Sequence, residues 1–191
     1  MKNVLHLILC LPLLVSCSTS SLSNPENTHT GEAHKNVVHE TPLDNSSAEL
    51  KRIKALEGKW RTTTSMFGTE NEEVFTEYKI TAGGSAVLET IFPGTPQEMV
   101  SVYFDDDSGK LSMTHYCMMR NRPHFSLVKS TQDELKLDVI KVEGLKSANS
   151  PSMGAITLKF KDNDHFSSTC QSDGDSEQNQ GPMTMNFTRV N

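Results

Sequence analysis

The stretch "SSAELKRIKALEGKW", Ser46 to Trp60, marks the point where the chain changes its hydrophobic period. Leu50, Ile53 and Leu56 recur at helical spacing after two serines that can cap a helix, and Gly58 closes the run. We therefore expect a short helix here. From the tryptophan onward apolar and polar residues alternate instead, which is typical of half-buried strands.

The rest of the chain repeats this alternation in short segments separated by turn signals such as "AGGS", "DDDSG" and "KDND". Closing so many short strands into a barrel removes the exposed edges of the sheet. We predict an all-β domain over residues 48–191, an up-and-down antiparallel β-barrel of about eight to ten strands with a short N-terminal helix. The expected strands are 59–67, 72–80, 85–92, 98–104, 110–117, 124–130, 134–142, 155–160, 166–171 and 183–190.

The N-terminus predicts export. Lys2 precedes an apolar run over residues 4–15 that is too short to span a bilayer, so residues 1–16 read as a signal peptide. The run ends in "LVSC", which resembles the lipobox of bacterial lipoproteins and implies diacylation of Cys17. An ordinary secreted protein with a chance cysteine is the alternative. Ser18 after the cysteine implies sorting to the outer membrane of a bacterial cell envelope, facing the periplasm.

Residues 17–47 are polar and rich in Ser, Thr and Asn, and we expect them to form a flexible tether between the membrane and the domain. His29, His34 and His39 lie in it and could catch a transition metal, but no neighbouring scaffold would fix their geometry. We therefore expect solvated histidines in a flexible arm. The sequence predicts no metal site and no cofactor.

Charge and motifs exclude several common functions. The formal net charge of −6, without a basic stripe, makes nucleic acid an improbable partner. The chain contains no GxGxxG, GxxxxGK[ST], HExxH or GxSxG motif and no CxxC pair. These absences disfavour the common enzyme classes, and the sequence does not indicate an oligomeric state.

The segment "LEGKW" resembles the Gly-x-Trp signature of calycins, the superfamily of lipocalins and fatty-acid-binding proteins. In that superfamily the tryptophan plugs one end of the barrel, and a cation from the last strand stacks over it. The resemblance implies that Gly58, Trp60 and Arg189 close one end of this barrel, and a cation over an indole is a favourable contact.

A narrower resemblance covers most of residues 56–191. Residues 77–117, "DNDHFSSTC" and the terminal "FTRV" are similar to an uncharacterised bacterial calycin-like domain found on exported proteins. This resemblance implies the fold and no activity. Cys170 stands where that family leads us to expect an aromatic residue.

The stretch "KLSMTHYC" places His115 and Cys117 on the same face of a strand as apolar residues. In a calycin barrel the apolar face lines the lumen, where such proteins hold ligands. Alternation in the neighbouring strands can add Tyr78 and Glu89 to the same interior. We predict that these four residues contact a small, largely apolar ligand, with His115 as its polar anchor and a Glu89 carboxylate that could keep both groups charged.

Other interpretations stay open at this stage. His115 could be a satisfied structural histidine, or it could form an acid/base pair with Glu89 in a small enzyme. Haem binding through His115 or His165 is a third possibility, although the glycine-rich pattern of nitrobindin-like barrels is missing. Cys117 and Cys170 could form a disulfide in an oxidising compartment or remain buried thiols.

Overall fold

The computed structural model describes residues 43–66, 72–173 and 181–190. The expected signal peptide, Cys17 and most of the expected tether lie outside these residues. No helix within the described ranges is long and apolar enough to cross a membrane. The elements are α1 (Ala48–Lys54), β1 (Gly58–Thr64), β2 (Glu72–Thr81), η1 (Ala82–Gly84), β3 (Ala86–Ile91), β4 (Met99–Asp105), β5 (Leu111–Tyr116), β6 (Arg122–Ser130), β7 (Glu134–Glu143), β8 (Ser152–Phe160), β9 (His165–Asp173) and β10 (Met183–Arg189).

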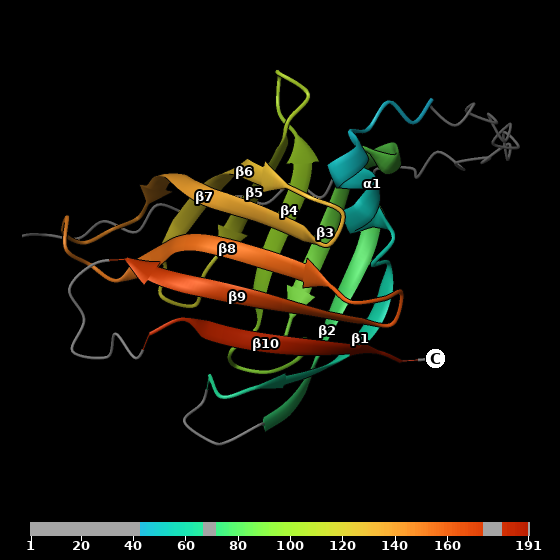
Figure 1. Ribbon diagram of the computed structural model, residues 1–191. Helices are drawn as coiled ribbons and strands as arrows, with labels where there is room; N and C mark the ends of the chain where they lie inside the picture. The colour runs from blue at the N-terminus through green and yellow to red at the C-terminus, as the bar shows by residue number, and fades with distance from the viewer. Residues whose placement is uncertain (1–42, 67–71, 174–180, 191) are drawn as a thin grey trace, which may run out of the picture. The chain divides into compact units, whose positions relative to one another are not determined.

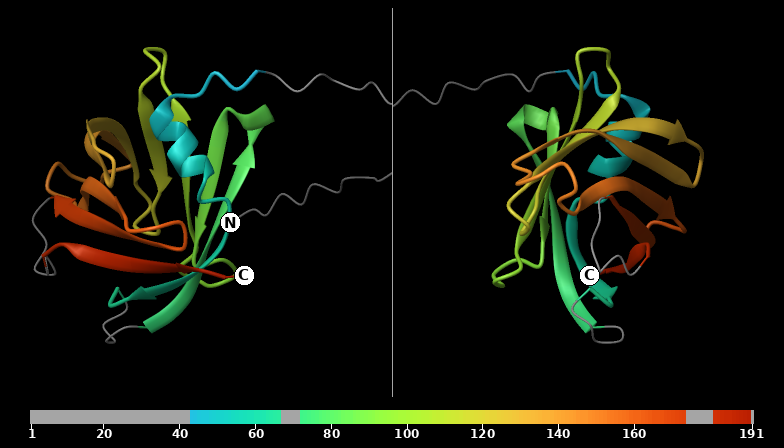
Figure 2. Two further views of the ribbon diagram at one scale, coloured as in Figure 1. Left: turned by 45° about the vertical axis from the view of Figure 1, so that its right-hand side comes forward. Right: turned by 90° about the vertical axis from the view of Figure 1, so that its left-hand side faces the viewer.

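The ten strands form a closed antiparallel barrel in which each strand pairs with its neighbours in sequence, and β10 pairs with β1 (Figure 1). Both further views show β10 running beside β1 where the barrel closes (Figure 2). The predicted fold class is therefore confirmed, including the short helix. Ten strands form where alternation predicted them, although β8 begins at Ser152, earlier than expected.

Helix α1 packs against β2, β3 and β4 at one end of the barrel (Figure 1). Ser47 is its N-cap, and the Ser47 hydroxyl accepts from the Leu50 backbone N–H at 3.0 Å. The Ser47 hydroxyl in turn donates to the Asp105 carboxylate at 2.7 Å, which ties the helix start to the end of β4. The helix ends at Lys54, so the expectation that Gly58 closes it is wrong. Gly58 opens β1 instead.

Arg189 binds the segment that joins the helix to β1. Its guanidinium donates to the backbone carbonyls of Ala55 and Glu57, both at 2.9 Å, and so satisfies carbonyls that follow the last helical turn. The same guanidinium lies over the Trp60 ring, 4.2 Å from its centroid. Gly58 has φ of +126°, a backbone conformation that other residues rarely adopt, and this explains the glycine at the start of β1.

Trp60 is fully buried and anchors an aromatic cluster. Its indole N–H donates to the Leu56 carbonyl at 2.7 Å. Phe166 meets the Trp60 ring edge-on at 4.8 Å between centroids and stacks on Phe187 at 4.2 Å. Tyr78 reaches the same cluster, with its ring 6.0 Å from that of Phe166. Side chains therefore fill the lumen beside Trp60.

We expect Trp60→Ala to lower the free energy of unfolding by about 3–5 kcal/mol, because truncating a large buried aromatic leaves a cavity. Urea unfolding of the purified protein measures the loss. Tyr116→Ala is the matched control, since Tyr116 is an aromatic residue of the barrel with 49% of its surface exposed. Equal losses in the two variants would contradict the role of Trp60 as the plug of the barrel.

Candidate functional site

A row of polar side chains crosses four neighbouring strands inside the barrel. Tyr78 on β2 lies opposite Glu89 on β3, Glu89 lies opposite Ser101 on β4, and Ser101 lies opposite His115 on β5. All four are buried. Because directly opposed residues on antiparallel strands point to the same face, the barrel register alone brings these side chains together. We call Tyr78, Glu89, Ser101 and His115 the polar row.

Glu89 is the acceptor at the centre of the polar row. The Tyr78 hydroxyl donates to Glu89 Oε1 at 2.5 Å, and the Tyr103 hydroxyl donates to Oε2 at 3.1 Å. Burial raises the pKa of Glu89, and the hydrogen bonds from Tyr78, Ser101 and Tyr103 act against that rise. Burial and the neighbouring carboxylate raise the pKa of both tyrosines well above the usual value. Both phenols therefore remain hydrogen-bond donors.

His115 ends the row and has Ser101 as its hydrogen-bond partner. Ser101 Oγ lies 2.9 Å from His115 Nδ1. The direction of this hydrogen bond is set by the tautomer of the ring: with the proton on Nδ1, Ser101 Oγ accepts. Burial lowers the pKa of His115 to about 4, so the ring is neutral at pH 7. In the tautomer with the proton on Nδ1, His115 Nε2 carries a lone pair.

The expectation that Glu89 and His115 face each other as a charged pair is wrong. Ser101 stands between them in the register, and the described residues show no ion pair between the two. His115 is also neutral, because burial disfavours its charged form.

A small cavity of about 40 Å³ inside the barrel adjoins the polar row. Met66 follows β1 and His115 lies near the end of β5, so the cavity lies toward the barrel end opposite Trp60. By volume it has room for about three water-sized groups. Its lining residues are Met66, Glu89, Ile91, Ser101, His115, Met153, Ile156, Ser168, Cys170 and Met185. We call this space the lumen cavity.

Two of the four predicted ligand contacts line the lumen cavity and two do not. Glu89 and His115 line it. Tyr78 belongs to the polar row but supports Glu89 from beside the aromatic cluster. Cys117 does not line it, because β5 ends at Tyr116 and Cys117 begins the following turn, where alternation no longer sets its direction.

The two described cysteines, Cys117 and Cys170, are both free thiols. Burial raises the pKa of Cys117, and burial together with nearby Cys117 raises the pKa of Cys170 to about 12. Both thiols are therefore protonated at pH 7. Cys170, which the sequence left without a role, contributes to the lumen cavity.

Several residues of the site were missed at the level of sequence. Ser101 and Tyr103 alternate with outward residues on β4, so parity on that strand could have found them. Met153 could not be found in this way. A register shift between Met153 and Ala155 in the β8–β9 ladder breaks the alternation, and this bulge belongs to the strand pairing rather than to the local pattern.

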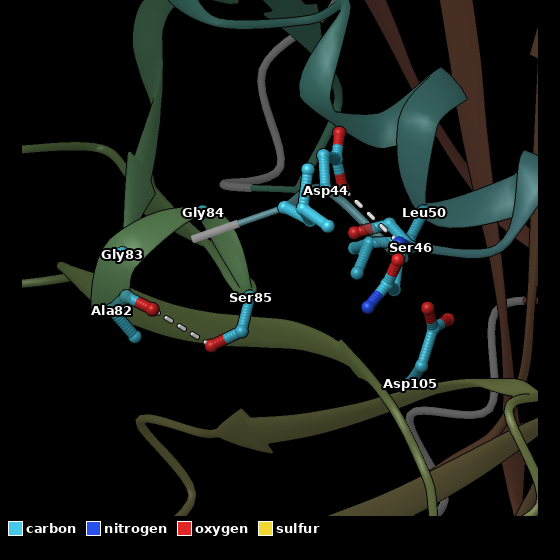
Figure 3. Close-up of a pocket in the computed structure, with 10 residues that line it drawn as sticks. Asp44, Ser46, Leu50, Ala82, Gly83, Gly84, Ser85 and Asp105 are labelled. Atoms are coloured by element: carbon cyan, nitrogen blue, oxygen red, sulfur yellow. Dashed lines mark hydrogen bonds between the residues drawn. The ribbon is translucent and has the colours of Figure 1, made fainter. Parts of the chain in front are cut away.

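An open depression of about 460 Å³ lies beside α1 and is less suited to binding (Figure 3). Figure 3 shows the Gly83–Gly84 turn facing Asp44 and Ser46, with Asp105 below them. The two carboxylates there already have partners. Asp44 pairs with Lys54 at 2.8 Å, and Asp105 accepts from Ser47.

A second open depression, of about 1050 Å³, lies at the α1 end beside Arg52, Phe160 and Arg189. Arg52 lies 4.4 Å over the Phe160 ring and donates to the backbone carbonyls of Thr131 and Gln132. The Arg189 guanidinium already lies over the Trp60 ring and donates to backbone carbonyls. These cations hold the barrel end together, so the lumen cavity is the better candidate site.

Haem does not fit the described residues. A lumen cavity of about 40 Å³ is far smaller than a porphyrin. His165 is 46% exposed at its side chain, lies at the start of β9 and contacts Asp162 at 2.8 Å, so it does not reach the cavity. The haem interpretation therefore has no site in this barrel.

Comparison with known proteins supports the fold alone. No family matches the chain, and no curated protein is similar in sequence. The crystal structure of Rv2717c from M. tuberculosis matches with a TM-score of 0.50 and 14% identity, covering 77% of this chain and 100% of that one. A redesigned β-barrel matches at a TM-score of 0.34 and 10% identity, over 73% of this chain and 95% of its own, a likeness too weak to carry an argument.

Proposed function

We propose that this protein is a lipid-anchored binding module of the bacterial cell envelope, whose barrel holds a small, largely apolar ligand against His115. The observation that carries the proposal is the lumen cavity, which lies inside the barrel and adjoins a neutral imidazole. A largely apolar cavity with a few placed polar groups is the usual design of a small-molecule site.

The hydrogen-bonding chemistry of His115 defines the ligand. In this proposal His115 Nδ1 donates to Ser101 Oγ, 2.9 Å away, and Nε2 offers its lone pair to the ligand. The complementary ligand has one hydrogen-bond donor and a short apolar body, as in a small alcohol. Met66, Met153 and Met185 line the cavity, and the flexible thioether side chains of methionine let a site adapt to somewhat larger molecules.

Acid/base catalysis by Glu89 and His115 receives less support from the geometry. Both Glu89 oxygens already accept hydrogen bonds from tyrosines of the barrel, so neither oxygen is free to act on a substrate. Ser101 separates it from the imidazole. A substrate would have to displace these bonds before Glu89 could move a proton at its reacting centre.

We expect His115→Leu to weaken ethanol binding roughly fivefold, because a neutral hydrogen bond contributes about 1 kcal/mol. Binding is followed by NMR of the methionine methyl groups, since three methionines line the cavity. Propane has nearly the same shape and no donor, so its affinity should not fall. Thr114→Val is the matched control, because Thr114 neighbours His115 on β5, bonds to His124 and does not line the cavity.

Two outcomes would contradict the ligand proposal. In the first, ethanol and propane leave the methyl signals of the cavity methionines unchanged. In the second, ethanol binds His115→Leu as well as it binds the wild type, which would leave His115 as a structural histidine.

The proposed lipid anchor at Cys17 has a separate test. We expect the wild-type protein to incorporate a labelled fatty acid in a bacterial host and Cys17→Ser to incorporate none, because "LVSC" resembles a lipobox. The membrane fraction is assayed for label and for precursor. A wild-type chain without label would contradict the anchor and leave the ligand proposal standing.

A further inference from the structure

Soft metal-binding donors gather around the lumen cavity. Five of its ten lining residues carry sulfur or imidazole nitrogen: Met66, His115, Met153, Cys170 and Met185. They come from the segment just after β1 and from β5, β8, β9 and β10, so only barrel closure brings them together. Thioether and thiolate sulfur are soft ligands that suit Cu(I), and imidazole also binds copper.

We propose that the lumen cavity binds one Cu(I) ion through His115 Nε2 and sulfur atoms of Met153, Met185 and Cys170. The inference rests on the proposed function, because it uses the same cavity. It names a second class of ligand that competes there with an organic molecule. A single ion fits a cavity of about 40 Å³ better than most organic ligands do.

The polar row prepares His115 for this role. Metal-binding histidines generally donate their second ring N–H to a neighbouring acceptor, which fixes the tautomer and the ring orientation. Ser101 Oγ lies 2.9 Å from His115 Nδ1 and is placed to be that acceptor. A proton on Nδ1 leaves the lone pair on Nε2 for the ion. Among the described residues, the His115 ring has no hydrogen-bond partner other than Ser101.

The remaining donors suit a monovalent ion in an apolar space. The thioethers of Met153 and Met185 bind as neutral ligands, and no bond breaks. When Cys170 Sγ binds, its S–H proton leaves to solvent and a sulfur–copper bond forms, so the ion and the thiolate together are neutral. Neutrality lowers the desolvation cost of placing an ion in this cavity. No change of oxidation state occurs.

The donor set disfavours zinc. In the parts of the chain that the structure describes, no group of three or more His, Cys, Asp or Glu side chains is placed to hold a metal ion. Zinc uses such groups almost exclusively. Methionine sulfur is therefore the donor that separates this site from a zinc site, and Met→Leu substitutions test it directly.

The test is a Cu(I) titration of the full-length chain, purified in detergent under ascorbate without oxygen, against bicinchoninate as the competing chelator. We expect Met153→Leu/Met185→Leu to lower Cu(I) affinity at least tenfold. Met118→Leu/Met119→Leu is the matched control, because these methionines are 50% and 45% exposed and lie outside the cavity. Both variants keep every histidine and cysteine of the N-terminal segment, so binding there cancels in the comparison.

Equal Cu(I) affinity in the two double variants would overturn the inference. X-ray absorption of the wild-type complex adds a readout that does not depend on variant folding. Copper–sulfur scattering with one nitrogen neighbour supports the site, and a purely nitrogen and oxygen shell overturns it.

Leucine keeps the volume and apolarity of methionine. Ethanol should therefore still bind Met153→Leu/Met185→Leu, reported by the Met66 methyl signal. Ethanol binding without Cu(I) binding refutes this inference alone, whereas Cu(I) binding without ethanol binding refutes the organic ligand alone.

Discussion

The buried carboxylate of Glu89 is the constraint around which the interior of this barrel is organised. Burying a carboxylate without partners would cost several kcal/mol, so the surrounding strands must supply donors. Tyr78 and Tyr103 supply two of them, and Ser101 supplies another. Tyr78 also packs on Phe166 in the aromatic cluster, so the same side chain joins the plugged end of the barrel to the polar row.

The polar row connects this constraint to the candidate site through Ser101. Ser101 lies opposite Glu89 and its hydroxyl is 2.9 Å from His115 Nδ1, so a proton on Nδ1 leaves the lone pair on Nε2 for a ligand. The lumen is thereby divided. Aromatic and aliphatic side chains fill the part beside Trp60, while Met153, Met185 and other soft or apolar side chains surround the cavity beside His115. The aromatic plug and the candidate site thus use different parts of one interior.

The sequence predicts the fold well because a barrel is built from local alternation. Trp60 and Arg189 could be placed through their resemblance to calycins, and Glu89 and His115 through parity along their own strands. The Ser101 link could not be placed, because it depends on the pairing of three strands. Met153 could not be predicted because a bulge interrupts the alternation of β8, and Cys117 was placed wrongly because β5 ends before it. Neither feature leaves a clear signal in the local sequence pattern.

The tautomer of His115 tests the central claim most directly. Long-range ¹H–¹⁵N spectra of the imidazole rings, with His115→Gln to assign the signals, report which nitrogen carries the proton. The account predicts a proton on Nδ1 and a bare Nε2, unchanged between about pH 8 and about pH 5, because burial lowers the pKa of His115 to about 4. A proton on Nε2, or an imidazolium that forms near the ordinary pKa of 6.5, would contradict it.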